Sequence, residues 1–66
     1  MTYYVTVSFY DDVPDTEEYG SQEEAQEAYQ TSVDMSHDGV LGDVARISYG
    51  VTKHNRNTNI ASYTFD

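Results

Sequence analysis

The chain has 66 residues, no cysteine, and 12 acidic residues against three basic ones, which gives a formal net charge of -9 at pH 7. A chain this short is expected to form a single domain over residues 1–66, with a small core and no disulfide to brace it. Its charge disfavours anionic membranes and naked nucleic acid as partners, because both are bound mainly through lysine and arginine.

The first expected element is a strand over residues 2–10, "TYYVTVSFY". Apolar and polar side chains alternate along it with the two-residue period of a half-buried strand. Its inward side carries Tyr3, Val5, Val7 and Phe9. Pro14 then favours a turn, because it fixes its own φ angle and lacks a backbone donor. The stretch 16–19, "TEEY", is left open as a further short, charged edge strand.

A helix is expected from about residue 22 to residue 34. Ser21 followed three residues later by Glu24 is a capping-box pattern, in which the two side chains satisfy backbone N–H groups at a helix start. Acidic residues in the first turn also suit the positive end of the helix dipole. The inward stripe of this helix is narrow and consists of Ala25, Ala28, Tyr29 and Ser32.

Two more strands are expected after the helix. Residues 44–52, "VARISYGVT", alternate again, and residues 60–65, "IASYTF", follow a polar turn rich in asparagine. Their inward residues are Ala45, Ile47, Tyr49, Val51, Ala61, Tyr63 and Phe65. The predicted fold is α+β, a two-layer sandwich of one helix on a three-stranded antiparallel sheet (β-α-β-β), with the last strand between the other two.

One stretch partly matches an EF-hand calcium loop. The matching residues, at positions one, three, five, six and eight, are Asp34, Ser36, Asp38, Gly39 and Leu41. Position twelve is Ala45 where the motif has a bidentate glutamate, and a strand follows where the motif continues into a helix. We therefore predict no metal site and a helix end that turns at Gly39, while weak calcium binding by residues 34–43 stays open.

The sequence motifs that usually carry catalysis are missing. There is no cysteine, no glycine-rich phosphate loop and no serine in a nucleophile elbow. His37 and His54 are expected to be exposed loop residues, short of the three or four ligands that zinc requires. So small a core also leaves no pocket that could separate the pKa values of paired carboxylates. We predict that the protein is not an enzyme, with no catalytic residues and no cofactor.

The acidic residues are unevenly distributed. Residues 1–43 hold eleven acids and no base, and residues 44–66 hold three bases and one acid, so the two parts contribute -11 and +2 to the total of -9. This asymmetry favours a dedicated acidic face for a cationic partner. The candidate partner-binding residues are Asp11, Asp12, Asp15, Glu17, Glu18, Glu23, Glu24 and Glu27, with Tyr10 and Tyr19.

The stretch "FYDDVPDTEEYGSQEEAQEAY" and the overall composition resemble, as a class, the small acidic proteins that bacteriophages make against host nucleic-acid machinery, DNA mimics among them. The resemblance covers less than half of the chain. It implies a cytoplasmic inhibitor whose acids contact lysines and arginines of a host nucleic-acid-binding protein. Tyrosines would add apolar anchoring, although Tyr29 fits the core better than the contact.

A second interpretation also stays open. The protein could be a small structural or assembly domain that forms homodimers or larger homo-oligomers through its sheet, with the acids serving only solubility. Tyrosine and arginine, which are enriched at interfaces, occur on the side of the sheet predicted to face away from the helix. The residues expected there are Tyr4, Thr6, Tyr10, Arg46, Ser48, Ser62 and Thr64.

Overall fold

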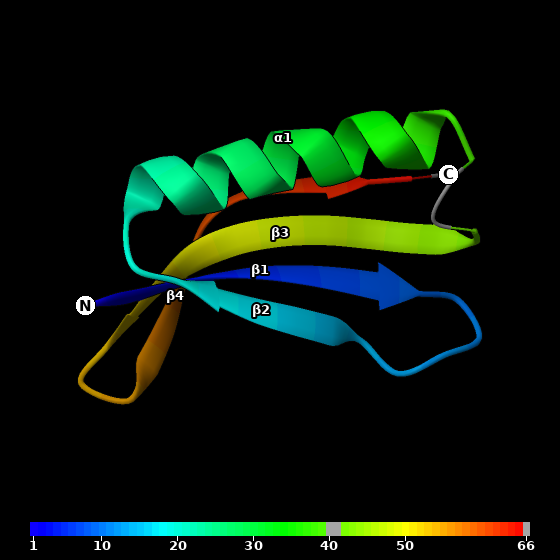
Figure 1. Cartoon of the computed structure of the whole chain (residues 1–66). Helices are drawn as coiled ribbons and strands as arrows, with labels where there is room; N and C mark the ends of the chain where they lie inside the picture. Colours follow the sequence, from blue (N-terminus) through cyan, green and yellow to red (C-terminus); the bar gives the residue numbers. More distant parts are fainter. Residues whose placement is uncertain (40–41, 66) are drawn as a thin grey trace.

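The computed structural model describes residues 1–39 and 42–65. One helix packs on a four-stranded antiparallel sheet, which confirms the predicted α+β class (Figure 1). The strands lie in the order β2-β1-β3-β4. In chain order the elements are β1 (Thr2–Phe9), β2 (Asp15–Tyr19), α1 (Gln22–His37), β3 (Val44–Lys53) and β4 (Arg56–Thr64).

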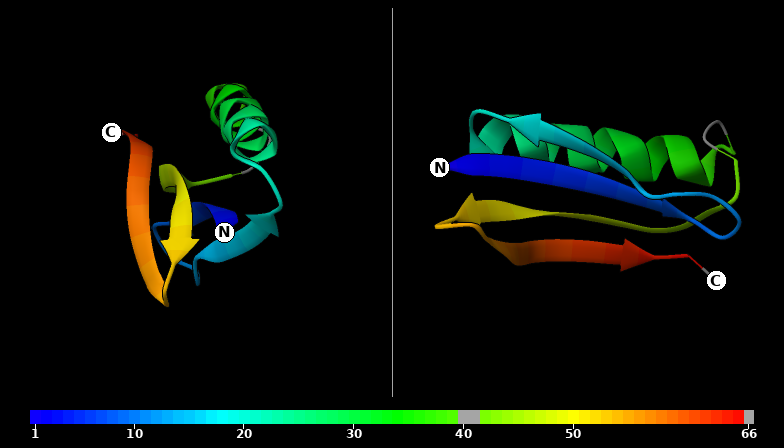
Figure 2. Two further views of the ribbon diagram at one scale, coloured as in Figure 1. Left: turned by 90° about the vertical axis from the view of Figure 1, so that its left-hand side faces the viewer. Right: turned by 90° about the horizontal axis from the view of Figure 1, so that it is seen from below.

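The strand order corrects the sequence-based expectation. The last strand, β4, lies at an edge of the sheet, and β1 pairs directly with β3 from Thr2↔Thr52 onward. The reason is β2, the segment left open at 16–19, which pairs with β1 along its whole length. The helix therefore joins β2 to β3, two strands that run parallel, and β1 lies between them. Seen from below in Figure 2, the four strands follow one another in this order.

The core lies between α1 and the central strands. Val5, Ile47 and Tyr49 are buried, as the alternation predicts. The other buried apolar residues are Ala25, Val33 and Val44. Burial of Val44 was not predicted, and it follows from a break in register: Ser8 pairs with Arg46, but Phe9 pairs with Val44, so Ala45 is skipped. Such a bulge reverses which side of the strand faces inward and brings Val44 to the helix.

The helix begins where the sequence predicted and ends later. Ser21 is its N-cap, whereas the helix continues through His37 instead of ending at Asp34. The extra turn lets His37 reach the end of β4, where its ring lies 5.3 Å from that of Tyr63. Within residues 1–39 and 42–65, no helix has both the length and the apolar character needed to cross a bilayer.

The β3–β4 turn is tighter than the asparagine-rich stretch suggests. Only His54 and Asn55 lie between the strands, and both have positive φ angles, 53° and 63°. A two-residue hairpin of this kind matches the twist of the flanking strands. Residues 56–59, expected in the turn, therefore belong to β4.

Candidate acidic interaction surface

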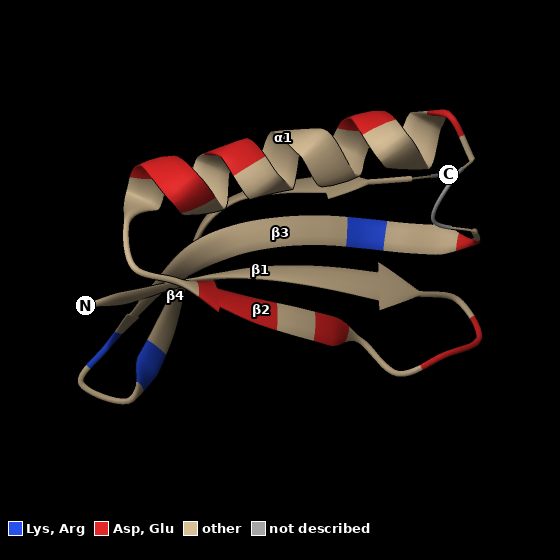
Figure 3. Ribbon diagram, in the orientation of Figure 1, with Lys and Arg blue, Asp and Glu red and all other residues tan. Residues whose placement is uncertain are grey.

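Charges of opposite sign occupy different parts of the fold (Figure 3). Acidic residues lie on β2, on α1 and in the loop that follows β1, whereas the basic residues lie on β3 and β4. Lys53 and Arg56 flank the β3–β4 turn, and Arg46 lies farther along β3. The sheet thus has an acidic edge at β2 and a weakly basic edge at β4.

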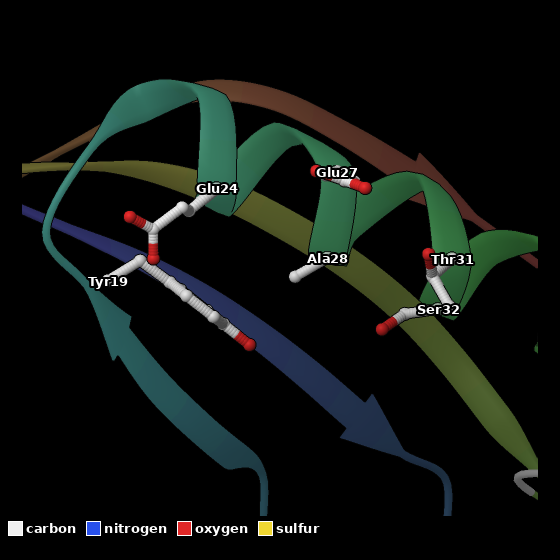
Figure 4. Close-up of a pocket in the computed structure, with 6 residues that line it drawn as sticks. All are labelled: Tyr19, Glu24, Glu27, Ala28, Thr31 and Ser32. Carbon is white, nitrogen blue, oxygen red and sulfur yellow. The ribbon is translucent and has the colours of Figure 1, made fainter.

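An open groove lies between the end of β2 and the outer side of α1. It has a volume of about 430 Å³ and is lined by Tyr19, Glu24, Glu27, Ala28, Thr31 and Ser32 (Figure 4). Tyr19 reaches it because this residue ends β2 on the side of the sheet that faces the helix, opposite Tyr3. Glu24 extends from α1 toward Tyr19. The turn at Gly20 and Ser21 is what brings strand and helix together here.

Glu17 joins this group through Tyr19. The Tyr19 hydroxyl donates a hydrogen bond to Oε2 of Glu17, two residues earlier on the same side of β2, at 3.2 Å. Burial raises the pKa of Tyr19, and the hydrogen bond to Glu17 and its negative charge raise that pKa further. The phenol therefore stays neutral and continues to donate to the carboxylate. Three carboxylates therefore lie at or next to this groove. Glu24 and Glu27 line it, and Glu17 accepts the hydrogen bond from Tyr19, which also lines it.

The start of α1 holds two of the predicted acids in place. The backbone N–H of Glu24 donates to Oγ of Ser21 at 3.3 Å, and the Ser21 hydroxyl lies 3.4 Å from Oε1 of Glu24. Glu23 and Glu24 both lie in the first turn, where the helix dipole favours negative charge. The cap thus orders the segment from which two acidic side chains extend.

A second acidic group lies at the far end of β1. Asp11, Asp12 and Asp43 line a hollow there together with Phe9. The backbone N–H of Val13 donates to Oδ1 of Asp12 at 2.8 Å, which shapes the loop. Tyr10, 60% exposed, donates from its hydroxyl to the carbonyl of Phe65 at 2.7 Å. This group is separated from the groove by the length of β2.

The predicted residues do not all share one face. Glu18 pairs with Tyr4, on the side of the sheet away from the helix, because successive strand residues point to opposite faces. Asp15 pairs with Val7 at the start of β2, and Glu23 is exposed on α1. Of the ten residues named from the sequence, the structure therefore brings Glu17, Tyr19, Glu24 and Glu27 together at the groove and Tyr10, Asp11 and Asp12 together at the other end.

Two contributors were missed from the sequence. Thr31 lines the groove, one helical turn beyond Glu27, so a helical spacing from Glu24 could have identified it. Asp43 carried no such local signal. It joins the second group because the N–H of Tyr10 donates to its carbonyl at 3.2 Å, a contact between distant parts of the chain. Tyr29 packs against the core, with its ring 4.9 Å from that of Tyr49, as the sequence favoured.

The EF-hand match has a different structural meaning. Asp34 and Ser36 lie inside α1, so they cannot act as loop ligands, and Gly39 has the positive φ of 77° expected of a helix end. Leu41 lies outside the described residues. His37 belongs to the helix and not to a loop, and His54 lies in the β3–β4 turn. Across the described residues, no three or more metal-ligating side chains cluster.

Comparison with protein families, with characterised proteins and with solved structures gives no significant match for this chain.

Proposed function

We propose that the protein is a non-enzymatic binding protein that inhibits a host nucleic-acid-binding protein by presenting a DNA-like negative surface. The observation that supports this most directly is the gathering of Glu17, Glu24 and Glu27 around the Tyr19 groove. The proposed place of action is the cytoplasm of the host cell.

The spacing of the acids supports a resemblance to a nucleic-acid backbone. Side chains three or four residues apart on a helix have Cβ atoms about 5–6 Å apart, which sets the separation of Glu24 and Glu27. Along β2, Asp15 and Tyr19 are separated by about 13 Å at the usual strand rise of about 3.3 Å per residue. A row of carboxylates thus follows the β2 edge and continues onto α1, as phosphates follow a strand.

Two tyrosines add apolar contact area to this acidic surface. Tyr19 lines the groove, and Tyr10 is largely exposed beside Asp11. Tyrosine contributes a large apolar area and a polar tip, which makes it frequent at protein interfaces. A lysine or arginine of the partner could therefore pair with Glu24 or Glu27 while its methylene stem lies on the Tyr19 ring.

The proposal is tested by capture of proteins from a nuclease-treated bacterial lysate. The wild type is compared with E17Q/E24Q/E27Q, which removes the groove charges, and with D34N/D38N/D66N, which changes the net charge equally at positions outside the predicted set. We expect wild type and control to retain nucleic-acid-binding proteins at about 50 mM NaCl and to release them at about 500 mM, because salt screens exposed charges. The groove variant should retain much less, and excess duplex DNA should displace the captured proteins.

The proposal is wrong if all three forms capture the same proteins at both salt concentrations. It is also wrong if duplex DNA fails to compete. For any captured protein, a mobility-shift assay must then show that the wild type displaces DNA from it.

A further inference from the structure

The two edges of the sheet differ in length and in charge. β2 has five residues, three of them acidic, whereas β4 has nine residues and only Arg56 is charged. Short, charged edge strands resist pairing with other chains, and long, uncharged ones invite it. No strand covers the outer side of β4 among the residues that the structure describes.

The backbone of β4 presents unpaired groups outward. The N–H of Phe65 donates to the carbonyl of Ala45 at 2.9 Å, and the register continues with Thr64 opposite Arg46 and Tyr63 opposite Ile47. Antiparallel ladders alternate between residues that bond to their neighbour strand and residues that do not. Phe65 and Tyr63 therefore bond toward β3, while the N–H and C=O groups of Ser62 and Thr64 point away from the sheet.

Side chains near this edge are also uncovered. Ile60 is 41% exposed and Tyr63 is 39% exposed, although Tyr63 lies on the helix side of the sheet. α1 packs mainly over β3, β1 and β2, and leaves β4 to one side (left view of Figure 2). The register shift near Ile60 ends before Ala61, so the run from Ala61 to Thr64 is regular and free to pair.

The charge distribution limits which partners this edge can accept. We propose that β4 pairs antiparallel with β4 of a second copy of this chain, which joins the two sheets into one of eight strands. The acidic β2 strands would then lie seven strand spacings apart, about 34 Å at roughly 4.8 Å each. This distance exceeds the Debye length of about 8 Å at physiological salt several times over, so the two acidic edges scarcely repel each other.

The other pairings are less favourable. Pairing of β2 with β2 would place six carboxylates within one strand spacing, because each copy contributes Asp15, Glu17 and Glu18. Pairing of β4 with β2 would leave a free edge on each copy and would build open chains. The β4–β4 arrangement closes on itself.

Sedimentation equilibrium with two substitutions at Ser62 tests this inference. S62P removes an outward N–H without touching the β3–β4 bonds, and S62K places a charge on the edge. T16K is the matched control, because it introduces the same charge on the opposite edge strand. Each chain has a mass of 7.5 kDa, so a dimer of two chains has 15 kDa. Circular dichroism and thermal melting establish that each variant is folded.

We expect the mass of the wild type and of T16K to reach 15 kDa as protein concentration rises toward about 1 mM. Both Ser62 variants should stay at the monomer mass, which corresponds to at least a tenfold loss of dimer affinity. Raising NaCl should leave the wild-type dimer unchanged or tighten it, the opposite of the salt response expected for the acidic groove. The inference is overturned by a wild type that stays monomeric, by a dimer that survives both Ser62 substitutions, by loss of the dimer in T16K, or by open-ended assemblies.

Discussion

Gly50 shows how one residue permits the packing on the open side of the sheet. Tyr4 lies opposite Gly50 on the neighbouring strand. A Cβ atom added at position 50 would lie 2.6 Å from the Tyr4 hydroxyl oxygen and 2.8 Å from Cζ, and it would also overlap the carbonyl oxygen of Thr58. The tyrosine ring therefore covers the strand where a side chain is missing, an arrangement that protects a glycine within a sheet.

Substitution of Gly50 by alanine is expected to destabilise the fold. The carbonyl of Thr58 belongs to the backbone of β4 and cannot move without disturbing the β3–β4 ladder. Overpacking of this kind typically reduces the free energy of unfolding by about 1–3 kcal/mol, and in a domain of this size each kcal/mol lowers Tm by about 4–8 °C. Thermal melting followed by circular dichroism measures the effect.

Gly20 provides the matched control. A Cβ atom there meets nothing within 4 Å, so G20A should melt within a few degrees of the wild type. If G50A melts at the wild-type temperature as well, the close packing of Tyr4 and Thr58 around position 50 is not present in solution.

At the level of elements, local signals were sufficient for some parts of the fold and not for others. The alternation of β1 identified Val5 as core, and the Ser21–Glu24 pattern located the start of α1. Both signals lie within a few neighbouring residues. Strand order, in contrast, depends on which distant segments pair, and the sequence left the decisive segment, β2, open because its charges obscure the pattern of a strand.

The same distinction applies to the candidate site. The acids of β2 and α1 were recognised from the sequence because they are dense and without counter-ions. Their division between two faces required knowing that β2 is a strand, which separates Glu17 from Glu18. Asp43 and the inward turn of Val44 both depend on the pairing of β1 with β3 and on its bulge, which no local pattern encodes.

The N-cap of α1 allows a test at the level of one element. Ser21→Ala removes the oxygen that accepts the N–H of Glu24, and such a loss typically lowers the free energy of unfolding by about 0.5–2 kcal/mol. Ser21→Asn keeps an accepting side chain without adding charge, so its stability should stay close to that of the wild type. Urea denaturation followed by circular dichroism at 222 nm, a standard helix signal, compares them.

Thr31→Ala separates capping from general effects of alanine in this helix. Thr31 is exposed in the middle of α1, where alanine is the better helix former, and its substitution should be neutral or slightly stabilising. Equal losses in Ser21→Ala, Ser21→Asn and Thr31→Ala would contradict a specific role for the cap.

At the level of the whole molecule, a net charge of -9 acts on a domain with little stability to spare. Repulsion among the acids of β2 and α1 opposes folding, and the basic residues lie on β3 and β4, away from β2, where they relieve little of it. Salt should therefore stabilise the fold, whereas it should weaken binding of a cationic partner.

Thermal melting between about 10 mM and 500 mM NaCl tests this, since the Debye length falls from about 30 Å to about 4 Å over this range. Because dimer formation could also respond to salt, all variants in this series carry S62K and are measured at low protein concentration. We expect Tm to rise with salt. At low salt, E17Q/E24Q/E27Q should melt at a higher temperature than the background form, and its Tm should rise less as salt is added. The reason is that like-charged neighbours on a helix are unfavourable by about 0.2–0.5 kcal/mol per pair. K53Q/R56Q, which makes the chain more negative, should show a larger rise. A Tm independent of salt in all forms would mean that repulsion among the acids of β2 and α1 does not lower the stability of this fold.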